Sequence, residues 1–136
     1  MRKETHSRAK SPITIGREDY ARLMRLADTI ATRNGEISDT LSRELDRAKV
    51  LASRRVPASV IRMGSSATYR TDTGEERRVT LVFPAEADIS AGKVSILTPI
   101  GIALLGLSPG QTMEWLARDG RRHVLTVLAV EAPASP

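Results

Sequence analysis

The sequence predicts an α+β protein, in which a short antiparallel hairpin of two helices precedes a small, mostly antiparallel sheet that carries one short helix. Three observations predict this fold. Apolar residues first recur every three or four positions, as in amphipathic helices. Pro57 then interrupts the helical pattern. Beyond it, β-branched runs alternate with Gly and Pro turns, as in strands. The predicted parts are a flexible tail over 1–12, the helical hairpin over 13–56, the sheet domain over 57–131 and a loose end over 132–136.

The first helix is expected over residues 17–33, after the extended segment SPITIG. Its apolar residues are spaced by 3, 4 and 3 positions, which places them on one face of a helix: Tyr20, Leu23, Ala27 and Ile30. Asn34 and Gly35 follow this stripe. Because Gly adopts the left-handed conformation of a helix C-terminus without strain, the pair is expected to end the helix.

The second helix is expected to begin at Ser38, a good N-cap residue, with Ile37 packing back as a hydrophobic staple. Its apolar stripe has spacings of 4, 3 and 4 positions: Leu41, Leu45, Ala48 and Ala52. Two narrow stripes on helices joined by a short turn fit each other. The segment is therefore predicted to form an antiparallel helical hairpin.

The second half contains five strand-like segments, with glycine turns at Gly74 and Gly120: SATYRT, RRVTLVF, KVSILT, QTMEWLA and RHVLTVLAVE. The segment TPIGIALLG lies among them and predicts a helix of about two turns. Thr98 can cap it, Pro99 suits its first position, and Gly106 suits the position just past its end. The leucines of this segment, Leu104, Leu105 and Leu107, are expected in the core.

The net charge of +5 is concentrated in the tail, because residues 1–11 hold four basic residues and one acid. This tail could add weak, salt-sensitive contacts to a phosphate backbone. No apolar run approaches the roughly 20 residues that span a bilayer, no secretory signal is evident, and cysteine is absent. A soluble cytoplasmic protein without membrane contact is expected.

Motifs for catalysis are sparse. His6 and His123 have no triad partner nearby in sequence, no phosphate-binding loop occurs, and no zinc-type ligand cluster exists. No resident cofactor or metal is expected. Direct DNA or RNA binding stays open as an alternative, through the tail and a group of basic residues: Arg47, Lys49, Arg54 and Arg55. The few aromatic residues provide little for base stacking: Tyr20, Tyr69, Phe83 and Trp115.

Glu36 and Asp39 are the one suggestive pair of carboxylates, three residues apart at the turn between the helices. Such a pair could share a Mg²⁺ ion with a substrate. The simpler interpretation is that Asp39 lies in the first turn of a helix, where the helix dipole favours negative charge, and that Glu36 is a solvated turn residue.

The segment TPIGIALLGLSPGQTMEW resembles the C-terminal signature of the Gre family of bacterial transcript-cleavage factors. With RELDRA and VTLVFPAEAD, the resemblance is closest to the branch of regulators of nucleoside diphosphate kinase (Rnk), and it extends over residues 13–130. It implies a coiled-coil hairpin followed by a domain of the FKBP-like fold. It also implies binding to RNA polymerase at the secondary channel, with altered nucleoside diphosphate kinase levels in the cell. Prolyl isomerisation, which the fold alone suggests, is disfavoured by the few aromatic residues.

In the cleavage factors the hairpin tip holds a catalytic Mg²⁺, and by resemblance Glu36 and Asp39 occupy the two acidic positions, exchanged. The hairpin is much shorter here, with about four turns in each arm. We therefore expect a polymerase-binding regulator that is not an enzyme and lacks efficient cleavage. The alternative is a Mg²⁺-dependent cleavage factor that uses both acids. The expected polymerase contact is an exposed surface at the start of the short helix: Thr98, Pro99, Ile100 and Gly101.

Overall fold

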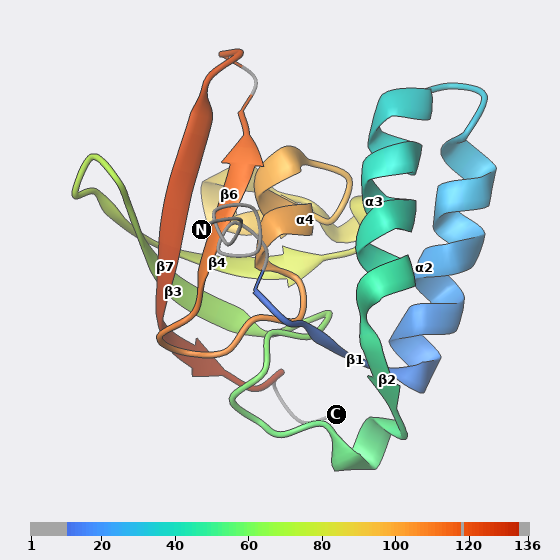
Figure 1. The fold of residues 1–136 in the computed structure, drawn as a ribbon, viewed down its shortest axis with the longest axis horizontal. Helices are drawn as coiled ribbons and strands as arrows, with labels where there is room; N and C mark the ends of the chain where they lie inside the picture. The colour runs from blue at the N-terminus through green and yellow to red at the C-terminus, as the bar shows by residue number, and fades with distance from the viewer. Residues whose placement is uncertain (1–10, 118, 134–136) are drawn as a thin grey trace, which may run out of the picture.

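The computed structural model describes residues 11–117 and 119–133, which form an α+β fold. Figure 1 shows two long helices standing beside a curled sheet, with a short helix between them. The helices are α2 (Arg17–Ile30), α3 (Gly35–Arg47) and α4 (Pro99–Leu104), with 3₁₀ turns η1 (Ser53–Arg55), η2 (Pro84–Glu86) and η3 (Ile89–Ala91). The strands are β1 (Thr14–Gly16), β2 (Lys49–Leu51), β3 (Ser66–Thr71), β4 (Glu76–Val82), β5 (Lys93–Ser95), β6 (Thr112–Leu116) and β7 (Arg122–Glu131).

The main sheet is mixed and has the strand order β5-β4-β3-β7-β6. Three neighbouring pairs are antiparallel, as predicted, but β4 and β5 are parallel. The turns η2 and η3 lie between β4 and β5 and carry the chain back, so that β5 runs in the same direction as β4. A second parallel pair, β1 with β2, lies at the base of the hairpin. The main sheet is thus mostly antiparallel, as predicted, and the parallel pairing of β5 with β4 is its departure from a purely antiparallel sheet.

The predicted start of α3 at Ser38 is wrong. The helix begins at Gly35, and Asn34 caps it by accepting a hydrogen bond from the backbone N–H of Ile37 at 3.2 Å. Asn is as good an N-cap as Ser. The buried Ser38 hydroxyl instead donates to the carbonyl of Ala27 on α2 at 2.8 Å. Ser38 therefore joins the two helices, and Gly35 belongs to α3 instead of ending α2.

The two helices are antiparallel and somewhat shorter than predicted. α2 ends at Ile30, and α3 ends at Arg47, so the outer positions of the second stripe lie beyond the helix. The centres of both stripes are buried against each other and the sheet: Leu23, Ala27, Leu41 and Leu45. The chain leaves α3 directly into β2, which pairs with the strand that leads into α2.

The prediction for α4 is confirmed. Pro99 is its first residue, and the hydroxyl of Thr98 accepts a hydrogen bond from the Gly101 N–H at 3.0 Å. Gly106 has φ of +79°, and a Cβ there would lie 2.7 Å from the Cβ of Ile13, so both conformation and space require glycine. The three leucines of the segment are at most 1% exposed, as expected of core residues: Leu104, Leu105 and Leu107.

One hydrophobic cluster joins the hairpin to the sheet. Polar contacts at its edge fix α2 in place. The Asp19 carboxylate accepts the Met63 N–H at 3.2 Å, and burial raises the pKa of Asp19. The guanidinium of Arg22 lies 4.0 Å from the ring centroid of Phe83, within cation–π range. The hairpin is thus packed along its side against the rest of the molecule.

Candidate functional site

The start of α4 lies where two surface grooves meet. Thr98, Pro99 and Ile100 are each partly exposed there. Gly101, which we expected on the same exposed surface, is buried, and a Cβ at this position would lie 2.3 Å from the Ser95 carbonyl oxygen. The close approach of Ser95 to α4 explains the difference. The candidate contact surface is therefore reduced to the first three residues.

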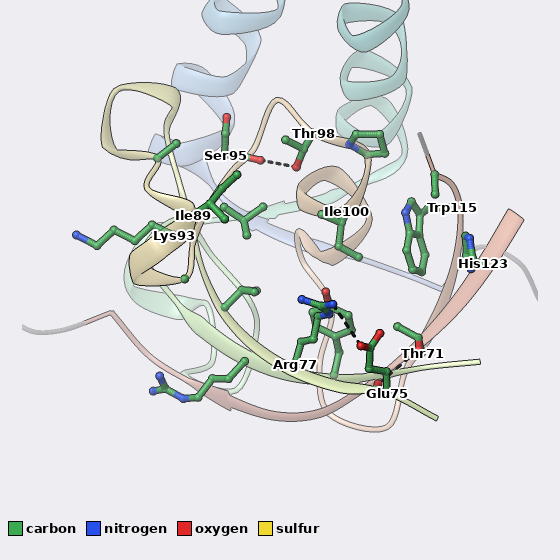
Figure 2. Close-up of a pocket in the computed structure, with 18 of the residues that line it drawn as sticks. Thr71, Glu75, Arg77, Ile89, Lys93, Ser95, Thr98, Ile100, Trp115 and His123 are labelled. Atoms are coloured by element: carbon green, nitrogen blue, oxygen red, sulfur yellow. Dashed lines mark hydrogen bonds and ion pairs between the residues drawn. The ribbon is translucent and has the colours of Figure 1, made fainter. Parts of the chain in front are cut away.

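The first groove has a volume of about 950 Å³ and lies between α4 and the inner face of the sheet; we call it the concave groove. Figure 2 shows Ile100 of α4 above it, Arg77 of β4 pointing up from the sheet, and Trp115 of β6 at one side. Tyr69 of β3 is the cross-strand neighbour of Arg77. Ile89, a residue that is 89% exposed, lies on the other side. The groove is largely apolar, with a cationic group on its floor.

The cations of the concave groove are held loosely. Arg77 pairs with Glu75 at 3.3 Å, and both side chains are more than half exposed. Arg78, the next residue on β4, directs its side chain to the opposite face of the sheet, where it pairs with Glu131, again between exposed side chains. Such exposed pairs contribute little to stability, so these cations could exchange partners at small cost. Of the described residues that line the groove, three are positively charged, namely Arg77, Arg78 and Lys93. One, Glu75, carries a carboxylate.

His123 lies at the end of the concave groove beside Trp115, with ring centroids 5.3 Å apart. Its Nε2 is 3.2 Å from a carboxylate oxygen of Asp119, and its Nδ1 is 3.5 Å from one of Asp72. These contacts raise the pKa of His123, with the hydrogen bond to Asp119 the largest cause. Asp119 is four residues from His123 in the sequence, so the sequence alone could have indicated this contact. Asp72 comes from the β3–β4 turn, which the sequence does not place nearby.

The second groove has a volume of about 610 Å³ and lies between α3, α4 and β6; we call it the hairpin cleft. Asn34 and Glu36 from the hairpin tip line it, and Pro99 and Leu116 face them from the sheet domain. Pro99 also lines the concave groove. The tip of the hairpin thus lies across this cleft from the start of α4, and Figure 1 shows that it does not extend far beyond the sheet domain.

Glu36 and Asp39 are both exposed on α3, Glu36 in the first turn and Asp39 in the second. The prediction that Asp39 lies in the first turn of the helix and Glu36 in the preceding turn is therefore wrong, because Glu36 is the acid in the first turn. Residues three apart on a helix share a face, so the two acids point to the same side. Among residues 11–117 and 119–133, no group of three or more His, Asp or Glu side chains is arranged to hold a metal ion.

The basic residues considered for nucleic-acid binding are dispersed. Arg47 is half-buried, pairs with Glu44 at 2.8 Å and donates to the Ser11 carbonyl at 2.7 Å, so it is engaged within the fold. Lys49, Arg54 and Arg55 are exposed near the base of the hairpin. Residues 1–10 of the basic tail lie outside the described residues. Over the part that the structure describes, no helix has the length and apolar character needed to cross a membrane.

Comparisons with known proteins give consistent matches over both halves of the chain. Residues 56–132 match the family described as "Transcription elongation factor, GreA/GreB, C-term", and residues 11–51 match "Rnk N-terminus". The chain is 35% identical over 124 residues to a regulator of nucleoside diphosphate kinase from Escherichia coli K12, covering 90% of this chain and 91% of that protein.

Transcription elongation factors are similar over a shorter span. The chain is 33% identical over 91 residues to GreA of Azorhizobium caulinodans, covering 66% of this chain and 55% of GreA. A solved structure of a prokaryotic transcription elongation factor GreA/GreB from Nitrosomonas europaea is 36% identical, with a TM-score of 0.71 and coverage of 88% of this chain and 98% of that one. The folds are therefore alike over nearly the whole described chain.

Proposed function

This chain belongs to the GreA/GreB family of transcription elongation factors, in which it is similar to the regulators of nucleoside diphosphate kinase, and on this premise we propose that it binds RNA polymerase and regulates elongation at the secondary channel without efficient transcript cleavage. The start of α4 makes the contact, through Thr98, Pro99 and Ile100. The chain is not an enzyme in this proposal.

One observation carries the proposal: Glu36 and Pro99 line the same cleft. The hairpin tip therefore lies beside the surface that docks. With 14 residues in α2 and 13 in α3, each arm is only ~20 Å long. Ligands must approach Mg²⁺ to about 2.0–2.1 Å to assist hydrolysis. A tip that stays beside its own docking surface is poorly suited to deliver Glu36 and Asp39 to a reaction centre inside the polymerase.

The docking surface is tested with Pro99→Glu, which places a charge on it. An acid in the first turn of a helix is electrostatically favourable, so the variant is expected to fold. We expect affinity for core RNA polymerase, measured by surface plasmon resonance, to fall about tenfold or more, as for the loss of an interface residue worth more than 1 kcal/mol. Ala58→Glu is the control, because Ala58 is exposed and lines neither groove. Equal binding by both variants contradicts the proposal.

The rival function is Mg²⁺-dependent transcript cleavage. It is favoured by the exposure of Glu36 and Asp39 on one face of α3. A backtracked elongation complex distinguishes the two functions. If the protein shortens the RNA, and the double variant Glu36→Ala/Asp39→Ala does not, the protein is a cleavage factor and the proposal fails.

The same proposal includes the division of the chain into domains, its location in the cell and its indirect effects. We infer that the hairpin over 13–56 is a short coiled coil and that residues 57–131 form an FKBP-like domain; the two family matches, which divide the chain between residues 51 and 56, support this division. A cytoplasmic location follows from a role in transcription. An effect on nucleoside diphosphate kinase levels would then be indirect, through transcription. Nucleic-acid contact by the basic tail would be an auxiliary interaction.

A further inference from the structure

We infer that His123 is a proton-controlled latch between two turns of the sheet. As an imidazolium it holds the β3–β4 turn through Asp72 and the β6–β7 turn through Asp119, and as a neutral imidazole it releases Asp72. His123 and Thr73 of the β3–β4 turn both line the concave groove, so the latch closes one end of that groove. All of its contacts lie within this chain, and the latch is therefore independent of the function proposed above.

The chemistry of the imidazole ring makes its two contacts depend on its charge. Nε2 lies 3.2 Å from a carboxylate oxygen of Asp119, and Nδ1 lies 3.5 Å from one of Asp72. A protonated ring has an N–H on both nitrogens, whereas a neutral ring has one N–H and one lone pair. After loss of the proton, one carboxylate faces a lone pair, which repels it. Both contacts are therefore favourable together only for the imidazolium.

Asp72 is the carboxylate that the neutral ring releases. Its contact with the ring is the longer of the two, and Asp72 is exposed, so water solvates the released carboxylate. Asp119 also accepts the backbone N–H of Arg121 at 2.9 Å, which fixes its carboxylate beside the ring. In the described structure, the other contact of the Asp72 side chain is a long hydrogen bond from the Val124 N–H at 3.4 Å. The side chain of Asp72 is therefore held to β7 mainly by the charged ring.

The other charged groups around the ring have partners of their own. Arg122, which follows Arg121 on the chain, pairs with Glu114 at 3.3 Å, and Arg77 pairs with Glu75 at the same distance. The hydrogen bond to Asp119 is the largest cause of the raised pKa of His123, followed among the raising causes by that to Asp72. The latch is thus closed at pH 6 and opens as the pH rises through a value above the ordinary 6.5.

Trp115 reports the state of the latch. It is the cross-strand neighbour of His123, with ring centroids 5.3 Å apart, and it lines both the concave groove and the hairpin cleft. Figure 2 shows both rings at the same end of the concave groove. A cation at this distance from an indole ring interacts with it, and this interaction disappears when the imidazolium loses its proton. Trp115 is the only tryptophan in the chain, so its fluorescence has one source.

The test follows the protein from about pH 5.5 to about pH 8.5 by two measurements, the fluorescence of Trp115 and the backbone ¹⁵N order parameters of Thr73 and Gly74. An imidazolium quenches indole emission, so the fluorescence should rise as His123 loses its proton. Over the same range, the order parameters should fall from about 0.85 towards about 0.6. Asp72→Asn should remove this fall, because an amide can accept from the ring N–H or donate to the ring lone pair.

Two further variants separate the latch from simple titration. His123→Gln should abolish the pH response of the fluorescence. Asp46→Asn is the matched control, because Asp46 is exposed on α3 and lines neither groove, and it should behave as the wild type. Order parameters that stay constant while the fluorescence titrates would contradict the inference. So would an equal loss of order in Asp72→Asn, or mobility that appears at Gly120 in the β6–β7 turn instead.

Discussion

The hydroxyl of Thr98 accepts the backbone N–H of Gly101 at 3.0 Å and donates to the carbonyl of Ser95 at 2.8 Å. One side chain thus caps α4 and ties it to the end of β5. The orientation of Pro99 and Ile100 depends on this link. The two hydrogen bonds of the Thr98 hydroxyl therefore help to position the surface that is proposed to contact the polymerase.

Replacing Thr98 with Ala removes both hydrogen bonds. We expect a loss of about 1 kcal/mol in the free energy of unfolding, the usual cost of losing an N-cap. Thr98→Ser keeps the hydroxyl and should retain most of the stability. Urea unfolding followed by circular dichroism measures the difference. Equal losses in the two variants would show that the methyl group, and not the cap, is what stabilises this position.

Gly101→Ala and Gly35→Ala should have opposite effects. A Cβ at Gly101 would lie 2.3 Å from the Ser95 carbonyl oxygen, and forcing it in should cost about 1–3 kcal/mol or more. A Cβ at Gly35 meets nothing within 4 Å at the start of α3, so alanine should stabilise the protein by up to about 1 kcal/mol. Thermal and urea unfolding check both signs. Destabilisation by Gly35→Ala would contradict the assignment of Gly35 to the helix.

Asn34→Ala tests the cap at the hairpin tip. The Asn34 side chain accepts the Ile37 N–H, and its removal should cost about 1 kcal/mol, while Asn34→Asp should be close to neutral because Asp caps equally well. Amide hydrogen exchange at Ile37 and Ser38 reports the local effect. If exchange there is unchanged in Asn34→Ala, the helix begins elsewhere.

The pH dependence of stability should reveal the contacts of His123. Asp119 and Asp72 raise its pKa above the ordinary value of about 6.5, so the folded state binds the proton more tightly than the unfolded state. The resulting stabilisation is fully present below pH 6.5 and is lost as the pH rises through the raised pKa. Wild-type stability should thus fall more between pH 6 and pH 8 than that of Asp72→Asn/Asp119→Asn.

An NMR titration of the histidine ring protons measures the same effect directly. The other histidine, His6, is removed by His6→Gln so that one signal remains. A pKa of His123 at or below that of an unstructured peptide would contradict the arrangement described here. The double Asn variant should return the pKa toward the peptide value.

Local features of this fold could be predicted from the sequence. Thr98, Pro99 and Gly106 determine α4 through capping, a fixed φ and a left-handed turn, all within nine residues. The start of α3 was mispredicted because Asn34 and Ser38 are equally suitable caps, and only packing against Ala27 decides that the Ser38 hydroxyl is used elsewhere. Sequence spacing carries no information about that contact.

Features that join distant segments could not be predicted. The parallel pairing of β5 with β4 depends on where η2 and η3 direct the chain, which no local propensity specifies. The burial of Gly101 depends on Ser95 approaching α4. The position of Arg77 in a groove with Trp115 arises from the curling of the sheet. The family resemblance supplied the candidate surface, but only the fold places it beside the hairpin tip.

The central claim is that the protein docks on RNA polymerase through the start of α4 and does not deliver a catalytic metal. Its most direct test is a titration of the protein into a backtracked elongation complex in which a GreA factor drives RNA cleavage. The account predicts that the wild type slows cleavage in proportion to its concentration, whereas Pro99→Glu at the same concentrations does not. RNA cleavage that stays unchanged, or that the protein itself accelerates through Glu36 and Asp39, would contradict it.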